Sequence, residues 1–330
     1  PRIDYSDSST EPSLLLEPQS TNLITYSSDF SSASWGKLNI GTGTVAVTSN
    51  QGVAPNGDLT ADRIQFNLNG GVSASDRSII RFNNSDASNR ILTFYLKSFN
   101  GIDQQISLHN GAEGVPFTVT SNWKRFDFVI PSGFNFQGLG LLGSRGVYSS
   151  DLLVWGAQLE QNSYATSYIP TSGSTATRLG ETANNAGGAG VFNSEEGVLY
   201  AEIKRAEGNA TSAAISLNNG TSSNGVSMYF FGVNNFYVDI FSSSGTVTIA
   251  GGVVSISDYI KVAVKYKNGD SAIWINGIEV ATNSAAVSLV GLNQLLFGYT
   301  NGGLPFYGKT KNIQVFNYAL TDEELQTLTT

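Results

Sequence analysis

The sequence predicts an all-β protein in which two antiparallel β-sandwiches of the jelly-roll type follow one another, with one short helix at the C-terminus. Three observations favour this class. Short runs of residues alternate between apolar and polar with period two, as in half-buried strands. The chain has 36 glycines, 8 prolines and 11% aromatic residues, which suits twisted strands and tight turns better than helices. Its 330 residues are enough for two domains with separate cores.

The strands of the first domain are expected between Leu14 and about Pro170. Clusters of Gly, Asn, Asp and Ser separate the alternating runs, and no helical stretch lies between them. This spacing is typical of an antiparallel sandwich or jelly roll. The runs are residues 44–48, 63–68, 91–96, 105–108, 124–130 and 152–159.

A segment of small and polar residues, 171–190, is interpreted as a linker with at most one short strand. We therefore expect a jelly roll over residues 1–178 and a second sandwich over residues 179–330. The strands of the second domain are expected at residues 198–204, 213–217, 226–231, 235–241, 259–266, 271–275 and 295–299.

Local signals predict two hairpins and the helix of the second domain. Asn268-Gly269 and Asn276-Gly277 each separate two strand patterns, and Asn-Gly favours the positive φ angles of tight hairpin turns. Thr321 and Glu324 form a capping-box pattern ahead of Leu325, which predicts the start of a short C-terminal helix.

Composition excludes several classes of chemistry. With 18 Lys+Arg against 26 Asp+Glu, the formal net charge is −8, the wrong sign for a nucleic acid partner. There is no cysteine and one histidine, His109, which excludes disulfides, a thiol nucleophile and a zinc finger. No apolar run approaches the roughly 20 residues that span a bilayer, so membrane insertion is not expected. The first residue is Pro1 rather than Met, which predicts that an N-terminal portion has been removed or is not included in this sequence.

No catalytic pair of carboxylates is apparent. Cleavage of a glycan would use two carboxylates about 5 to 10 Å apart, and an E-x-D-x-E strand would place them on one face. The chain instead has Glu195-Glu196, adjacent and on opposite faces if extended, and Glu323-Glu324, which a helix N-terminus already explains. We therefore expect no catalytic residue and no enzymatic activity.

Long phrases of the first domain resemble bacteriophage tail fibre and tail spike proteins. They are Pro1 to Asp7 (PRIDYSD), Leu14 to Trp35 (LLLEPQSTNLITYSSDFSSASW), Leu152 to Glu160 (LLVWGAQLE) and Tyr164 to Arg178 (YATSYIPTSGSTATR). In that family such phrases bracket a jelly roll akin to carbohydrate-binding modules. The resemblance implies a virion protein, commonly a homotrimer.

The second half is similar to concanavalin A-like, laminin-G-type lectin domains. The similarity rests on Val264 to Val280 (VKYKNGDSAIWINGIEV) and Gly308 to Leu325 (GKTKNIQVFNYALTDEEL), and it covers about residues 190–330. This sandwich hosts lectins, adhesion domains, glycanases and structural modules, so the resemblance implies the fold and leaves the function open.

Candidate glycan contacts are rings and polar side chains in predicted loops, because the apolar face of a pyranose stacks on a ring while its hydroxyls seek polar partners. The alternatives are that the tyrosines pack at loop bases, that the arginines make surface ion pairs and that His109 is hydrogen-bonded within its turn. The candidates are Arg81, His109, Tyr148, Asn218, Tyr299, Asn301, Phe306 and Tyr307.

No cofactor is required by these patterns, although jelly rolls of the resembled type often carry a structural calcium ion. Its oxygen ligands would come from Asn22, Asp29 or Asp151 together with backbone carbonyls.

We expect a non-catalytic virion appendage, exposed on the virion surface, that binds host cell-surface polysaccharide and other virion proteins. Two alternatives remain open. The sandwiches could be structural, decorating the virion or joining fibre segments, or they could be the binding accessories of a depolymerase whose catalytic domain lies before Pro1.

Overall fold

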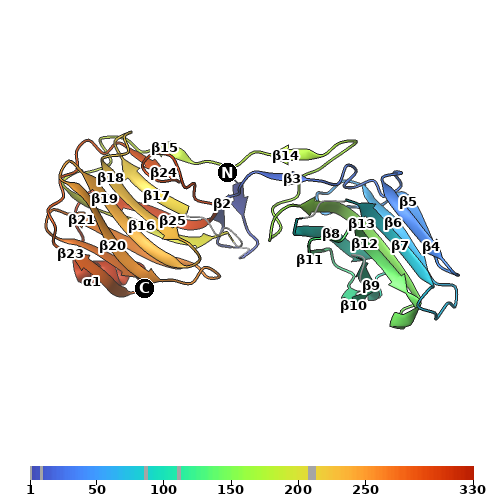
Figure 1. The fold of residues 1–330 in the computed structure, drawn as a ribbon. Coiled ribbons are helices and arrows are strands. Elements are labelled where there is room, and N and C mark those ends of the chain that lie inside the picture. The colour runs from blue at the N-terminus through green and yellow to red at the C-terminus, as the bar shows by residue number, and fades with distance from the viewer. Residues whose placement is uncertain (1, 8–9, 85–87, 110–112, 207–212) are drawn as a thin grey trace. The chain divides into compact units, whose positions relative to one another are not determined.

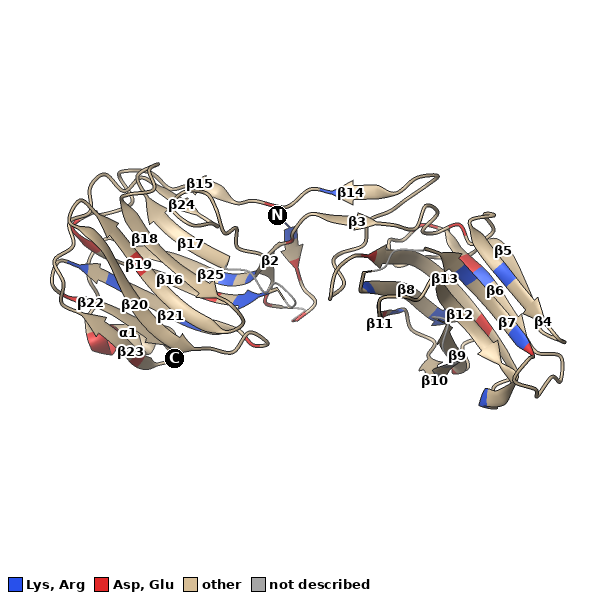
Figure 2. Ribbon diagram, in the orientation of Figure 1, with Lys and Arg blue, Asp and Glu red and all other residues tan. Residues whose placement is uncertain are grey.

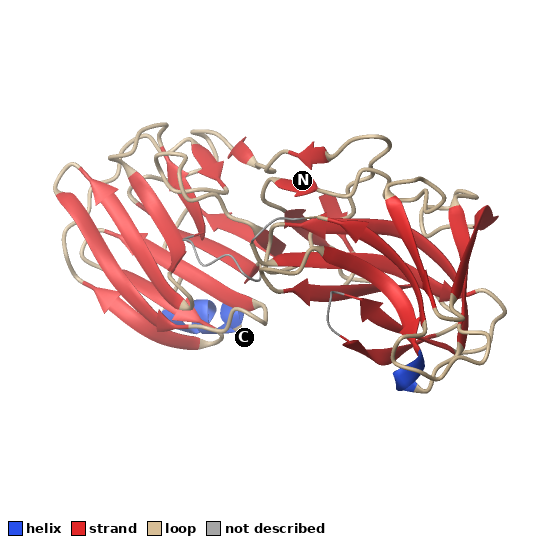
Figure 3. Cartoon of the chain, turned by 45° about the vertical axis from the view of Figure 1, so that its right-hand side comes forward, coloured by secondary structure: helices blue, strands red, loops and turns tan. Residues whose placement is uncertain are grey.

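The computed structural model describes residues 2–7, 10–84, 88–109, 113–206 and 213–330. The chain divides into two compact units (Figure 1). The inserted unit is Gln19–Leu179, and the split unit combines Pro1–Pro18 with Gly180–Thr330. The regular secondary structure of both units is almost entirely antiparallel strand (Figure 3), which confirms the predicted fold class. Charged residues are few and scattered over both units (Figure 2).

The inserted unit has two five-stranded sheets, ordered β10-β9-β12-β7-β4 and β11-β8-β13-β6-β5, and a small β14-β3 pair. Its core includes Phe30, Phe66 and Phe94, each at most 1% exposed. The strands are β3 (Ser20–Asn22), β4 (Trp35–Ile40), β5 (Thr44–Gly52), β6 (Ala61–Asn67), β7 (Arg77–Asn83), β8 (Arg90–Ser98), β9 (Gln104–His109), β10 (Glu113–Val119), β11 (Lys124–Ile130), β12 (Phe136–Leu142), β13 (Ser149–Glu160) and β14 (Ala176–Arg178).

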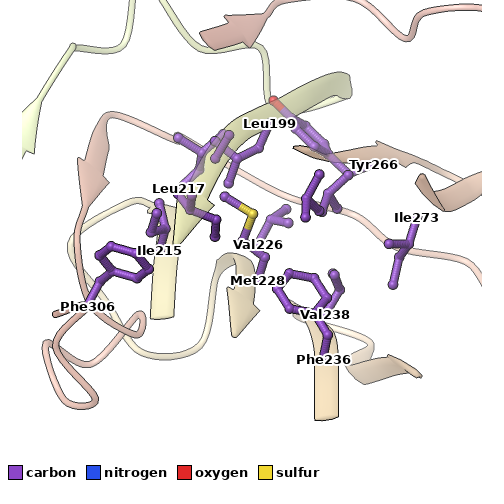
Figure 4. Close-up of a cluster of buried hydrophobic side chains, with 14 of the residues drawn as sticks. Leu199, Ile215, Leu217, Val226, Met228, Phe236, Val238, Tyr266, Ile273 and Phe306 are labelled. Atoms are coloured by element: carbon purple, nitrogen blue, oxygen red, sulfur yellow. The ribbon is translucent and has the colours of Figure 1, made fainter. Parts of the chain in front are cut away.

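The split unit has a seven-stranded sheet, β1-β2-β25-β16-β21-β22-β23, and a six-stranded sheet, β15-β24-β17-β18-β19-β20. Figure 4 shows part of its core, where Leu199, Met228 and Phe236 come from different strands. The elements are β1 (Arg2–Asp4), β2 (Ser13–Leu16), β15 (Asn184–Ala186), β16 (Glu196–Arg205), β17 (Ala213–Asn218), β18 (Gly225–Phe231), β19 (Asn235–Ser242), β20 (Gly245–Val253), β21 (Ile260–Lys267), β22 (Ser271–Ile275), β23 (Ile278–Asn283), β24 (Gln294–Leu296), β25 (Gly308–Phe316) and α1 (Asp322–Thr329).

The N-terminal segment corrects the predicted domain bounds. Residues 1–18 were expected in the jelly roll, but β2 pairs with β25, with Leu14 opposite Thr310 and Leu16 opposite Gly308. Leu16 is 1% exposed in the core of the split unit. The expected linker, 171–190, contains β14 and β15, which pair with β3 and β24. The inserted unit therefore interrupts the sequence of the split unit.

The two hairpins and the C-terminal helix predicted for the second half are confirmed, and one turn differs in its φ angles. Strands β21, β22 and β23 form consecutive antiparallel hairpins, and the capping box of Thr321 and Glu324 begins α1, as predicted. At the second hairpin Asn276 and Gly277 both have positive φ, 49° and 81°. At the first turn Gly269 has φ 74°, whereas Asn268 is not among the residues with positive φ, so only its glycine takes the left-handed conformation.

The strand predicted at residues 295–299 ends early, because β24 spans Gln294–Leu296 and residues 297–298 form a bend. Within the described residues no helix is long and apolar enough to cross a membrane.

We predict that Leu16→Ala destabilises the split unit by about 2–4 kcal/mol, because it removes a buried side chain and leaves a cavity. Trp274 reports on this unit, since the other tryptophans, Trp35, Trp123 and Trp155, lie in the inserted unit. The measurement is urea unfolding followed by fluorescence. Ile3→Ala is the matched control, because Ile3 lies on β1 and is 60% exposed. A loss as small as that of the control would contradict the role of β2 in this core.

Candidate functional site

An aromatic row lies on the outward face of the six-stranded sheet of the split unit. Alternate residues of β18 and β19 enter the core, among them Met228 and Val238, so the residues between them face away from it. The outward side chains of these two strands, together with a ring that follows β24, form the aromatic row: Phe231, Tyr237, Tyr229, Tyr299 and Phe241.

The five rings contact one another in sequence. Tyr229 and Tyr237 are opposite each other in register and stack with centroids 5.8 Å apart and planes at 23°. Phe231 meets Tyr237 edge to face at 6.2 Å. Tyr299 meets both Tyr229 and Phe241 edge to face, each at 5.4 Å. Such contacts hold the rings in fixed orientations.

Asp239 supplies a polar centre beside the row. Its carboxylate accepts hydrogen bonds from the Tyr299 hydroxyl and from Oγ1 of Thr248, the latter at 2.6 Å. Ser227 lies opposite Asp239 in register, and its buried hydroxyl has no hydrogen-bond partner in the described part of the chain. The rings are thus fixed by a carboxylate as well as by one another.

Tyr229 and Tyr299 are neutral near pH 7. Burial raises the pKa of the Tyr229 and Tyr299 phenols, and the adjacent Asp239 carboxylate raises both pKa values further. A neutral phenol can donate a hydrogen bond to the carboxylate, whereas a phenolate would repel it. Tyr229 and Tyr299 therefore remain hydrogen-bond donors on this surface.

The rings of this face reach solvent, whereas Asp239 beside them is 5% exposed. Phe231 is 56% exposed, Tyr229, Tyr237 and Tyr299 are half-buried, and Thr248 on β20 is exposed. The surface offers ring faces beside hydroxyl groups, which matches the two needs of a sugar: apolar packing for its ring and hydrogen bonds for its hydroxyls.

The six strands of this sheet contain one acidic residue, Asp239. Hydrolysis by two carboxylates would need a second one across the bond to be cleaved. The arrangement can therefore bind a sugar, but its strands do not supply the pair that this mechanism requires.

Tyr299 is the predicted site residue that lies on the aromatic row. Two others in the split unit are buried, which corrects the expectation that they reach a ligand. Asn218 is 0% exposed, and its Oδ1 accepts hydrogen bonds from the Gly220 amide and Gln294 Nε2. Phe306 is 1% exposed and packs edge to face on Phe297 in the core.

Asn301 and Tyr307 have local roles in the loop that follows β24. Asn301 is exposed, and its Oδ1 accepts a hydrogen bond from the Gly303 amide. Tyr307 is half-buried and packs against the core of the split unit, in agreement with the alternative that tyrosines pack at loop bases.

Arg81 and His109 are brought together in the inserted unit, on one face of the sheet β10-β9-β12-β7-β4. Gly138 on β12 is in register with both of them. His109 is 5% exposed, and burial, with the positive charges of Arg81 and Arg77, lowers its pKa to about 4. Tyr148 is 44% exposed and lies in the loop before β13, where its carbonyl accepts a hydrogen bond from the Leu68 amide.

Each of the three candidate calcium ligands, Asn22, Asp29 and Asp151, is engaged by protein groups. The Asn22 side chain is fully buried and bonded to backbone, accepting from Ile24 and Leu159. Asp151 forms a two-pronged ion pair with Arg63 at 2.7 and 2.9 Å. Asp29 caps its own turn, accepting from the backbone amides of residues 31 and 32. The described residues contain no group of three or more His, Cys, Asp or Glu suited to a metal.

The acidic pairs also have local explanations. Glu196 forms an ion pair with Lys267 at 2.8 Å, which with its hydrogen bonds lowers the pKa of the Glu196 carboxyl. Glu324 completes the capping box of α1, and Glu323 lies in the same first turn. Glu196 and the Glu323-Glu324 pair therefore have local structural roles.

One cavity of about 160 Å³ lies in the inserted unit, lined by Gln19, Ser20, Thr21, Leu23, Gln161 and Asn162. Its lining contains no aromatic ring and no charged side chain, so it lacks the platform that the aromatic row provides.

Sequence reasoning missed Tyr229, Tyr237 and Asp239. A signal existed in Tyr237-x-Asp239-x-Phe241, in which polar and aromatic residues alternate with the core residues Val238 and Ile240. The predicted contacts lie in expected loops, whereas Tyr229, Tyr237 and Asp239 lie on the strands β18 and β19.

Comparisons with known proteins agree with this fold. The family model described as the concanavalin A-like lectin/glucanases superfamily matches residues 180–326, so this part of the chain is similar to that family. Comparison with curated proteins finds no matching sequence.

Similar solved structures include a sialidase CBM40 from Ruminococcus gnavus bound to α2,3-sialyllactose, with 23% identity, 42% of this chain and 84% of that chain covered, and a TM-score of 0.37. Another is the leech intramolecular trans-sialidase, with 21% identity and a TM-score of 0.36. That match covers 42% of this chain and 23% of the leech chain. A third is domain 4 of AbnA, an extracellular arabinanase from Geobacillus stearothermophilus, in complex with arabinotriose. The identity is 16% and the TM-score 0.37, and the match covers 48% of this chain and 73% of that chain.

We predict that His109 makes the stability of the inserted unit depend on pH. Its folded-state pKa of about 4 lies below its ordinary value of 6.5, so the unfolded chain binds more protons between these values. The free energy of unfolding should therefore fall as pH decreases from 6.5 towards 4. In urea unfolding at several pH values, His109→Gln should lose less stability than the natural chain over this range. Equal losses in both proteins would show that other groups cause the effect.

Proposed function

We propose that this protein binds glycans without cleaving them, and that it does so as a receptor-binding part of a bacteriophage tail fibre or tail spike. The observation that carries the binding proposal is the aromatic row around Asp239 on an open sheet face. Rings held in fixed orientations lose little conformational entropy when a sugar packs on them.

Two further observations support glycan binding. Residues 180–326 have the fold of concanavalin A-like lectins and glucanases, a class whose members include sugar-binding proteins. The aromatic row lies within that range, beside the hydroxyl groups of Thr248 and Tyr299, which the buried Asp239 carboxylate orients.

The proposed lack of catalysis is supported by the carboxylates. Asp239 is the acidic residue of the six-stranded sheet, Glu196 pairs with Lys267, and Glu323 and Glu324 lie in the first turn of α1. The assay is release of reducing ends from host polysaccharide. Release that disappears on substitution of one acidic residue would overturn this part of the proposal.

The virion assignment is supported by the long phrases in residues 1–35 and 152–178 that resemble tail fibre and tail spike proteins. We propose a location on the virion surface, with cell-surface polysaccharide and other virion proteins as partners and a homotrimeric assembly. Antibodies raised against this chain should label the tails of intact virions in electron micrographs. Labelling of bacterial cells in the absence of phage would instead indicate a bacterial adhesin.

We predict that Tyr237→Ala weakens binding to host polysaccharide by at least about fivefold, as expected when a central aromatic contact is truncated. The measurement is binding of the full chain to immobilised polysaccharide. Tyr318→Ala is the matched control, because Tyr318 is 51% exposed and lies outside the aromatic row.

The possible outcomes separate the alternatives. Unchanged affinity of a folded Tyr237→Ala variant would move the site away from the aromatic row. Failure of the natural chain to bind any host polysaccharide would favour a structural role in the virion.

A further inference from the structure

Basic residues outnumber acidic ones on four neighbouring strands of the inserted unit. The neighbouring strands β9, β12, β7 and β4 contain Lys37, Arg77, Arg81 and His109 but no acidic residue. The formal net charge of the whole chain is −8, so this local excess of positive charge runs against its average. Glu113, on the edge strand β10, is in register with His109.

Strand register brings three of these residues to one face. Arg81 and His109 flank Gly138 on β12, and Arg77 lies four residues before Arg81 on β7, so alternation places both arginines on the same side. The neighbouring residues Ile80 and Phe82 belong to the core, which directs Arg77 and Arg81 outward.

Two glycines between these strands allow the side chains to approach. A Cβ at Gly138 would lie 2.0 Å from the carbonyl oxygen of Ile80, and one at Gly140 would lie 2.4 Å from Cγ1 of Ile79. Neither position tolerates a side chain. Both glycines are buried, so side chains of neighbouring strands cover them.

Neither arginine has an ion-pair partner in the described part of the chain. Elsewhere in the same unit Arg63 pairs with Asp151 at 2.7 Å and Arg125 with Asp127 at 3.3 Å. Arg81 instead lies 4.0 Å above the centre of the Phe136 ring, an arrangement that leaves the edge of the guanidinium free to donate. The buried Nε of Arg77 has no hydrogen-bond partner among the described residues.

The His109 imidazole is also left unsatisfied. It is 95% buried, being 5% exposed, and its Nδ1 has no hydrogen-bond partner among the described residues. Burial and the two arginine charges lower its pKa to about 4, so the ring is neutral near pH 7. An unpaired buried polar atom costs free energy that a ligand group could recover.

We propose that Arg77, Arg81 and His109 form a second glycan-binding site, which takes a sugar unit carrying an anionic group, a carboxylate or a sulfate. The anion would lie against the two guanidinium groups, whose paired N–H groups donate to two oxygens of the carboxylate or sulfate. His109 would form a hydrogen bond with the same sugar unit. The inference deepens the proposed function by naming a ligand class and a site separate from the aromatic row.

The first test uses the natural chain, in which His109 is the only histidine and its ring resonances are therefore unique. The probes are methyl glucuronide, a methyl glucoside sulfate and the neutral methyl glucoside. The charged probes should shift the His109 resonances saturably and raise its pKa above about 4, because a bound anion offsets the two arginine charges. The neutral probe should do neither. A response to the glucuronide alone would assign a carboxylate, and a response to both charged probes would assign anionic sugars in general.

Variants identify the residues responsible. Arg81→Gln should weaken binding of the charged probes at least about tenfold, as expected for loss of charge-assisted hydrogen bonds. Lys37→Gln is the matched control, because it also removes one positive charge. Lys37 is exposed and lies on β4 opposite Ile80, so it is on the other face of the sheet from Arg81. If Arg81→Gln does not fold, Arg77→Gln provides the same comparison.

The test also separates this proposal from the aromatic row. Tyr237→Ala should leave the His109 response unchanged, even if it abolishes binding of neutral glycans. The second site is refuted if no charged probe shifts His109, if the neutral probe shifts it equally, or if Lys37→Gln weakens binding as much as Arg81→Gln.

Discussion

Strict alternation of side chains between the two faces of each antiparallel strand is the constraint on which both candidate sites depend. In β18 and β19 the core takes Met228 and Val238, so Tyr229, Tyr237 and Asp239 must face outward. A shift of one residue in register would place the phenols and the carboxylate in the core. The free energy gained by burying the apolar set thus also fixes the arrangement of the exposed set.

The same constraint produces two surfaces with different chemistry. The six-stranded sheet of the split unit presents aromatic rings around one carboxylate. The β9-β12-β7-β4 face of the inserted unit presents two arginines and a neutral imidazole. Rings select the apolar faces of sugars, whereas arginines select anionic groups, so the two proposed sites would recognise different features of one polysaccharide.

Contacts of Arg2, Glu17 and Glu181 join the two sequence segments of the split unit next to the positions where the inserted unit begins and ends. Arg2 forms ion pairs with Glu17 at 2.7 Å and Glu181 at 2.8 Å, and the backbone amide of each glutamate donates to the other residue. These contacts join the end of the first segment to the start of the second. The N-terminal strands extend a sheet of the second segment, in which β2 pairs with β25 and Leu14 lies opposite Thr310.

The sequence by itself determined the features that depend on neighbouring residues. Period two identified the fold class and most strands, with β11 and β22 at the predicted bounds, and local signals located the hairpins and the capping box of Thr321 and Glu324. Only the tertiary structure decided that residues 1–18 join the split unit, that Asn218 and Phe306 are buried, and that Arg81 meets His109 across Gly138. These outcomes depend on which distant strands pair and in which register, and local alternation carries no information about the partner strand.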